Sequence, residues 1–128
     1  MSKIIHTDAA PAAIGPYSQA VVAGGLVFTS GQIAINPETG AVEATTIEAQ
    51  TEQVCKNIAA VLKASGSSLE RVVKTVCFLS DMGDFAAFNA VYSTYFTGKP
   101  ARSCVAVREL PKGVLVEVDT IAEVEEKA

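Results

Sequence analysis

The chain has 128 residues, of which 49% are hydrophobic and 19% charged, and its net charge is −4. This length allows one hydrophobic core, so residues 1–128 are expected to form a single domain. The basic residues are scattered singly and form no stripe, which argues against nucleic acid as a partner. No apolar run approaches the roughly 18 residues that span a bilayer. Residues 1–15 also lack the apolar block of a signal peptide.

We therefore expect a cytoplasmic protein without a membrane partner. Its apolar fraction is high for so small a domain, which predicts self-association through an apolar face. The cysteines, Cys55, Cys77 and Cys104, are odd in number and form no CxxC motif, so they are expected to be free thiols in a reducing compartment. His6 is the only histidine and lies far from all three in the sequence, so we expect no zinc site.

The N-terminal part of the chain reads as a surface segment followed by a hairpin. Residues 1–18 are rich in turn formers and are expected to lie along the surface. Gln19–Ala23 and Leu26–Ile35 are strand-like, and the Gly24-Gly25 pair between them is typical of a two-residue hairpin turn. Residues 36–40 form a turn.

The middle of the chain predicts helix, strand and helix. Thr45-x-x-Glu48 fits a capping box for a first helix that ends before Gly66. Arg71–Ser80 is rich in β-branched and aromatic residues and reads as a buried strand. A second helix follows, capped by Asp81 or Asp84 and ended by Gly98 and Pro100; its apolar stripe comprises Phe85, Phe88, Tyr92 and Tyr95. Single helices between strands predict an α+β domain with both helices on one face of a mixed sheet.

The last part of the chain reads as a hairpin with charged side chains on apolar strands. Arg102 opens the first strand and Glu117 lies in the middle of the second. Charges are costly to bury unless they are paired or hydrogen-bonded. If Cys104 faces Glu117, then Arg102 faces Asp119 and all four line one surface. Two interpretations stay open: a structural ion pair between Arg102 and Asp119, or a site that grips an anion and transfers a proton.

Other residues carry weaker signals. Cys104 has no nearby histidine to activate it, so we expect it to pack rather than to act as a nucleophile. Asn89 falls on the edge of the apolar stripe of the second helix, where either core packing or function accounts for an amide. Tyr17 follows a Gly-Pro turn and could cover a site or plug a gap. Ser30 and Gly31 interrupt a strand, and Gly31 marks a bulge or a close backbone approach.

Several segments, in order along nearly the whole chain, resemble the RidA (YjgF) family of reactive intermediate deaminases. The matching segments are Ala13-Ile14-Gly15-Pro16-Tyr17-Ser18-Gln19-Ala20, Thr29-Ser30-Gly31-Gln32, Val73-Lys74-Thr75, Asp84-Phe85 with Asn89 and Tyr92, Pro100-Ala101-Arg102-Ser103, and Leu110-Pro111-Lys112-Gly113 through Val116-Glu117-Val118. The resemblance implies a chorismate-mutase-like α+β fold, a homotrimer with clefts between subunits, and no cofactor. It also implies hydrolysis of imines and enamines, such as 2-iminobutanoate, 2-iminopropanoate and 2-aminoacrylate, to 2-oxo acids and ammonia.

The resemblance also implies roles for individual residues. Arg102 matches the arginine that holds the substrate carboxylate, and Glu117 matches the acid that positions the attacking water. Cys104 matches a position that lines the site mainly through its backbone. The remaining positions that line the cleft are Tyr17, Ser30, Gly31 and Asn89.

Two departures from the family pattern concern the site. Only Thr97-Gly98-Lys99 separates Phe96 from Pro100, where many relatives have a longer segment, and Asp119-Thr120 replaces the usual Glu-Ala. The alternative functions are a non-catalytic trimeric protein that binds small carboxylates such as 2-oxo acids, and a chaperone-like protein. RNA cleavage, also attributed to the family, is disfavoured by the acidic balance of the chain.

Overall fold

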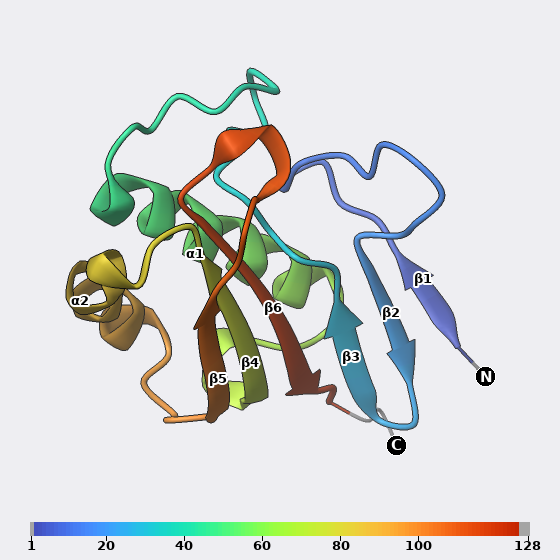
Figure 1. Ribbon diagram of the computed structural model, residues 1–128. Helices are drawn as coiled ribbons and strands as arrows, with labels where there is room; N and C mark the ends of the chain where they lie inside the picture. The colour runs from blue at the N-terminus through green and yellow to red at the C-terminus, as the bar shows by residue number, and fades with distance from the viewer. Residues whose placement is uncertain (1, 126–128) are drawn as a thin grey trace.

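The fold is one mixed six-stranded sheet with two α-helices on one of its faces (Figure 1). The computed structural model describes residues 2–125. The strand order is β1-β2-β3-β6-β4-β5. The strands are β1 (Lys3–Ile5), β2 (Ala20–Ala23), β3 (Leu26–Thr29), β4 (Val72–Leu79), β5 (Ala101–Ala106) and β6 (Val116–Glu123), and the helices are α1 (Ile47–Ala64) and α2 (Phe85–Tyr95). The predicted α+β architecture is confirmed.

The N-terminal hairpin forms at the predicted glycine pair. Gly24 and Gly25 have φ values of 60° and 77°, which is the left-handed geometry that a two-residue hairpin turn requires. The expected strand Leu26–Ile35 is too long, because β3 ends at Thr29 and only isolated bridges follow at Gln32 and Ile35. The surface segment also contains a strand that the sequence did not predict, β1, which pairs with β2.

The N-cap of the first helix lies one residue later than predicted. The side chain of Thr46, rather than Thr45, accepts a hydrogen bond from the backbone N–H of Ala49. Gly66 follows the last turn with φ 79°, as predicted. One face of α1 is buried against the sheet and α2, which places its apolar residues in the core; the largest are Val54, Ile58, Val61 and Leu62.

The predicted C-terminal hairpin is wrong. β4 lies between β5 and β6, pairing with β5 in parallel and with β6 antiparallel. Parallel neighbours need a crossover, and α2 supplies it between β4 and β5. Residues 107–115 then carry the chain over β4, and they include the 3₁₀ turn Pro111–Gly113. The strands that carry Arg102 and Glu117, β5 and β6, are therefore not adjacent in the sheet.

The register places the two charges on opposite faces of the sheet. Arg102 is the partner of Thr75, which is buried beneath α2. Glu117 is the partner of Phe78, whose side chain points to the face without helices, since its neighbours Cys77 and Leu79 point into the core. Asp119 shares the face of Glu117, so its expected ion pair with Arg102 is also wrong.

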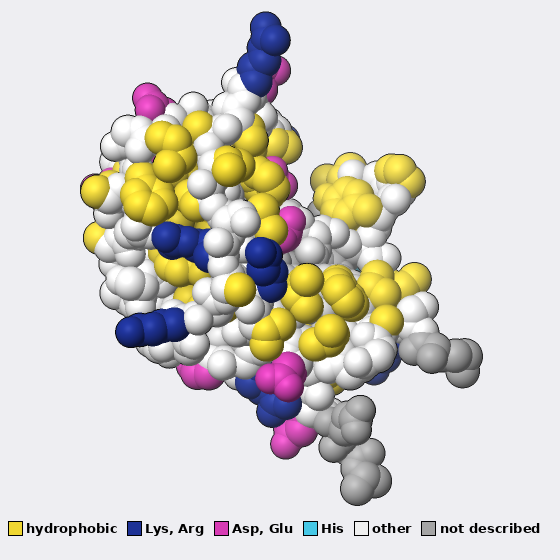
Figure 2. Space-filling view, turned by 60° about the horizontal axis from the view of Figure 1, so that its bottom comes forward, with side chains coloured by type: hydrophobic (Ala, Val, Ile, Leu, Met, Phe, Trp, Pro, Cys, Tyr) yellow, Lys and Arg dark blue, Asp and Glu magenta, His cyan; other side chains and the backbone are white. Residues whose placement is uncertain are grey.

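The face of the sheet opposite the helices carries exposed apolar side chains. Phe28 on β3 is 43% exposed and Val105 on β5 is 46% exposed. Figure 2 shows hydrophobic side chains gathered in patches on the side of the molecule that it presents. No helix within residues 2–125 is both long enough and apolar enough to cross a membrane.

Candidate functional site

Arg102 is held by α2 in a pocket at the edge of the sheet. Its Nη1 donates a hydrogen bond of 2.7 Å to Oδ1 of Asn89. The guanidinium carbon lies 4.9 Å from the ring centroid of Tyr92 and 5.4 Å from that of Phe85. The pocket measures about 430 Å³ and is lined by Asn89, Tyr92, Ser93, Phe96, Thr97, Lys99, Pro100 and Arg102. Asn89, for which core packing and function both stayed open, is partly buried and orients the guanidinium of Arg102.

The aromatic support beneath Arg102 is itself fixed. The hydroxyl of Tyr92 shares a buried hydrogen bond of 2.8 Å with Thr75 on β4, and its ring stacks on Phe96 with centroids 4.5 Å apart. Burial raises the pKa of Tyr92, so the ring stays neutral at physiological pH. Cation–π contacts and one hydrogen bond orient the guanidinium but leave most of its N–H groups available.

The Arg102 guanidinium has no acidic partner within 4.0 Å among residues 2–125. Within residues 2–125, the one ion pair closer than 4.0 Å joins His6 and Asp8. A planar cation that is oriented but not neutralised is suited to binding a planar anion such as a carboxylate.

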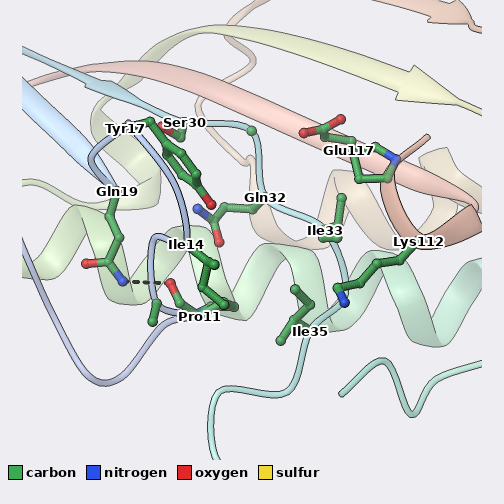
Figure 3. A pocket seen from close by; sticks show the side chains of 13 residues that line it. Pro11, Ile14, Tyr17, Gln19, Ser30, Gln32, Ile33, Ile35, Lys112 and Glu117 are labelled. Carbon is green, nitrogen blue, oxygen red and sulfur yellow. Dashed lines mark hydrogen bonds between the residues drawn. The ribbon is translucent and has the colours of Figure 1, made fainter. Parts of the chain in front are cut away.

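Glu117 lines a second and larger pocket, on the other side of the sheet. The pocket measures about 540 Å³ and is lined by Pro11, Ala12, Ile14, Tyr17, Gln19, Ser30, Gly31, Gln32, Ile33, Ile35, Pro111, Lys112 and Glu117. In Figure 3, Glu117 and Lys112 lie on one side of this lining, Gln19 and Pro11 lie on the other, and the ring of Tyr17 lies beside Gln32. Burial raises the pKa of Glu117, and the nearby Asp119 raises it further.

Gly31 makes room for the Glu117 carboxyl group. A Cβ atom at position 31 would lie 2.9 Å from Cδ of Glu117, so a side chain at this position would force the Glu117 carboxyl group to move. The predicted close approach at Gly31 is therefore confirmed, and its partner is a side chain. Gln32 fixes the same segment to β6, because its backbone N–H donates to the carbonyl of Val118 and its carbonyl accepts from the Val118 N–H.

Ser30 is hydrogen-bonded to the loop that precedes β2, which carries Tyr17. The Ser30 hydroxyl donates a 2.6 Å hydrogen bond to the carbonyl of Ser18, next to Tyr17. Its proton is thus engaged within the protein, and towards a ligand the oxygen can only accept. Tyr17 itself is 54% exposed and contributes its ring to the pocket wall.

Gln19 anchors this loop and was missed by the sequence analysis. Its side chain is 2% exposed, accepts from the backbone N–H of Thr7, and donates to the carbonyls of Thr7, Ala10 and Pro11. A glutamine at the start of a strand gives no signal that its amide is buried. The turn-rich composition of residues 7–18 could have suggested that a polar side chain elsewhere binds their backbone groups.

Cys104 lies beside Cys77 on the neighbouring strand, on the helix-covered face with Arg102. Burial raises the pKa of the Cys104 thiol, although Arg102 opposes the change. The thiol therefore stays protonated at neutral pH, which is consistent with packing and not with nucleophilic attack.

Within the chain, the predicted site residues thus form two groups. Tyr17, Ser30, Gly31 and Glu117 line the larger pocket, while Asn89 and Arg102 line the smaller one, and the sheet lies between them. The fold of the chain does not bring Arg102 and Glu117 together.

The chain matches known proteins over nearly its whole length. The family model described as Endoribonuclease L-PSP matches residues 7–124. A regulator named AldR from Lactococcus lactis is 54% identical over 95% of this chain and 98% of its own length. A 2-iminobutanoate/2-iminopropanoate deaminase from Salmonella typhimurium is 49% identical over 95% of this chain and 98% of its own.

A solved structure extends the likeness to three dimensions. The crystal structure of Escherichia coli TdcF with bound serine matches with a TM-score of 0.91 and 42% identity, over 96% of this chain and 99% of the other. The matches span nearly the full length of each protein. The family model matches residues 7–124, a range that includes every residue lining the two pockets. The chain therefore belongs to the RidA family, whose model carries the description Endoribonuclease L-PSP.

Proposed function

We propose that the protein is a 2-iminobutanoate/2-iminopropanoate deaminase, which hydrolyses reactive imines and enamines of the 2-aminoacrylate type to 2-oxo acids and ammonia. The observation that carries the proposal is the guanidinium of Arg102, which Asn89, Phe85 and Tyr92 orient without neutralising it. The deaminase name of the Salmonella typhimurium relative supports the same reaction.

In the proposed reaction, Arg102 binds the carboxylate and Glu117 handles the proton. An enamine first takes a proton from solvent on its terminal carbon and becomes the protonated imine. Glu117 accepts a proton from water as the water oxygen attacks the imine carbon, which gives a carbinolamine. The protonated Glu117 then gives this proton to the amino nitrogen. As the C–N bond breaks, Glu117 takes up the proton of the carbinolamine hydroxyl, and the 2-oxo acid and ammonia leave. Burial raises the pKa of Glu117, which makes its carboxylate a stronger base towards water than an exposed carboxylate.

The proposed chemistry asks for no metal or organic cofactor. A protonated imine is already electrophilic, so positioning of the carboxylate and one acid/base group account for the reaction. The three cysteines are free thiols, which fits the reducing conditions of the cytoplasm, where we place the protein.

We also propose that the active unit is a homotrimer with the site in the cleft between two subunits. Arg102 and Glu117 lie on opposite faces of one sheet, so they can act on one substrate molecule only across a subunit boundary. The exposed apolar face that carries Phe28 and Val105 offers a surface for such packing.

The test couples the protein to an imine-producing enzyme. Added to a threonine or serine dehydratase reaction, the protein should accelerate formation of the 2-oxo acid. Arg102→Ala should abolish the acceleration while leaving the melting temperature near that of the wild type, because Arg102 is exposed. Arg71→Ala, an exposed arginine that lines neither pocket, is the matched control and should keep full activity.

A second function uses the same arginine without turnover. A receptor for small carboxylates would need the Arg102 pocket alone, and the AldR relative is named a regulator. It predicts thermal stabilisation by 2-oxobutanoate, lost in Arg102→Ala, without any acceleration of imine hydrolysis. Absence of acceleration by the wild-type protein with several amino-acid-derived imines would exclude the deaminase and leave this function.

A further inference from the structure

Two lysines hold an unfavourable backbone conformation. Among residues 2–125, the non-glycine residues with positive φ are Lys99, at 53°, and Lys112, at 57°. In this left-handed region the Cβ atom crowds the backbone, so glycine or asparagine is preferred there. Each lysine also has a glycine beside it, Gly98 or Gly113, so glycine would serve either turn at least as well.

Each of these lysines lines one of the two pockets. Lys99 lines the pocket of Arg102, and Lys112 lines the pocket of Glu117, where Figure 3 shows its side chain running beside Ile35. The only ion pair in the described part of the chain is that of His6 and Asp8, so no carboxylate neutralises either lysine within 4.0 Å. A strained backbone that persists at a pocket points to a function of the side chain.

The pockets therefore carry a charge opposite to that of the whole protein. The net charge of the chain is −4, yet the two linings hold Lys99, Arg102 and Lys112 against the single carboxylate of Glu117. A positive cleft in an acidic protein draws anions towards itself and away from the rest of the surface.

We propose that Lys99 and Lys112 steer the anionic substrate into the site, as a pair of cations on the two sides of the cleft. This inference rests on the proposed function. The ligand class is a small 2-imino or 2-oxo carboxylate with a single negative charge. Steering acts over several ångströms and needs no fixed contact, which suits a flexible lysine better than a planar arginine. Fast capture matters for a substrate that reacts with water and with thiols before it arrives.

The test measures how kcat/KM depends on salt. An amino-acid oxidase produces the imine, and semicarbazide competes for it, so the protein concentration that halves semicarbazone formation reports relative kcat/KM. Lys99→Gln and Lys112→Gln should each lower kcat/KM about threefold at low ionic strength. The variants should converge on the wild type at roughly 0.5 M salt, where screening shortens the range of the attraction. Lys56→Gln, an exposed lysine on α1 outside both pockets, should match the wild type.

Glycine variants separate steering from turn formation. Lys99→Gly and Lys112→Gly relieve the backbone conformation, so the melting temperature should equal or exceed that of the wild type while kcat/KM falls as in the glutamine variants. Lys99→Arg and Lys112→Arg keep the positive charge, so both variants should keep the wild-type kcat/KM. Glutamine variants with wild-type kcat/KM at low salt, or with a loss that persists unchanged at high salt, would overturn the proposal.

A binding experiment tests the role of the two lysines even if the proposed deaminase reaction does not occur. If the wild-type protein hydrolyses no imine, the deaminase proposal fails, and titration calorimetry with 2-oxobutanoate decides the role of the lysines. A higher Kd in both glutamine variants at low salt supports steering. A Kd equal to that of the wild type, or no binding by the wild type, overturns it.

Discussion

At the scale of single residues, Glu117 combines a functional position with a cost to stability. Its neighbours Val116 and Val118 point into the core, and its own carboxyl is half-buried beside Gly31 and near Asp119. Burial raises its pKa in the folded state above the value in the unfolded chain. The favourable contribution to stability is thus present at low pH, and it is lost as the pH rises through the raised pKa.

Glu117→Gln should therefore stabilise the protein at neutral pH while it abolishes imine hydrolysis. The amide removes the charge whose burial is unfavourable, and the gain should shrink as the pH falls towards about 4, where the wild-type carboxyl also becomes neutral. Melting temperatures of both proteins at pH 4 and pH 7 measure this difference. Glu38→Gln, in an exposed turn, is the control and should show no such gain. A variant less stable than the wild type at pH 7 would contradict the prediction.

The two charged residues of the site could be recognised from the sequence. The face of the sheet on which each one lies could not be predicted. Arg102 and Glu117 are conspicuous because ionised groups rarely interrupt apolar strands. Alternation along each strand is a local property, so it placed Glu117 with Asp119 correctly. Which side of the sheet Arg102 faces depends on its partner strand, which lies far away in the sequence.

At the scale of elements, the loop before β2 is held mainly by the side chain of Gln19. Gln19 makes hydrogen bonds to Thr7, Ala10 and Pro11, and Ser30 adds a bond to Ser18. Gly15, with φ 128°, allows the sharp bend that presents Tyr17. The loop therefore owes its shape to a few polar contacts rather than to a regular ladder.

Gln19→Ala should loosen this loop and lower the activity. The substitution leaves buried backbone groups of residues 7–11 without partners, which costs about 1–3 kcal/mol of unfolding free energy. Amide hydrogen exchange should speed up at Thr7, whose N–H loses its acceptor, while the amides of β4 keep their protection. Urea titration and exchange measured by mass spectrometry test both expectations.

Gln53→Ala is the control for this experiment, because its side chain makes a single hydrogen bond, to Asn57 on the same helix. It should leave exchange in the loop unchanged. Unaltered exchange at Thr7 in Gln19→Ala would show that other contacts hold the loop.

The elements themselves were largely predictable, whereas their pairing was not. Capping residues, glycine turns and apolar spacing located α1, β4 and the β2–β3 hairpin within a few residues. The order β6-β4-β5 depends on α2 acting as a crossover. A helix between two strands is compatible with that order and with a sequential one, and the short turn at Pro111–Gly113 favoured the wrong choice.

At the scale of the whole molecule, the proposed chemistry needs an assembly of several subunits, because the Arg102 pocket and the Glu117 pocket lie apart in one chain. A carboxylate on Arg102 and a water on Glu117 would lie on opposite sides of the same sheet in an isolated subunit. In a ring of identical subunits, each interface instead joins the Arg102 pocket of one subunit to the Glu117 pocket of the next. Steering by Lys99 and Lys112 would then act on both sides of the same opening.

Complementation between inactive subunits tests this assembly directly. Arg102→Ala and Glu117→Gln should each be inactive alone, since each lacks one half of every site. In mixed trimers formed from equal amounts, about a quarter of the sites pair an intact Arg102 with an intact Glu117 on the neighbouring subunit, so about a quarter of wild-type activity should return. Light scattering during size-exclusion chromatography checks that both variants and their mixture are trimers.

The value of this experiment lies in the opposite predictions of the two arrangements. If both residues served one substrate from within the same subunit, every subunit in the mixture would carry a defective site, and co-refolding would restore nothing. Val105→Asp, which places a charge on the exposed apolar face, should weaken assembly and abolish complementation in either variant background. Restored activity that disappears with Val105→Asp would therefore tie catalysis to the interface and not to the fold of a single subunit.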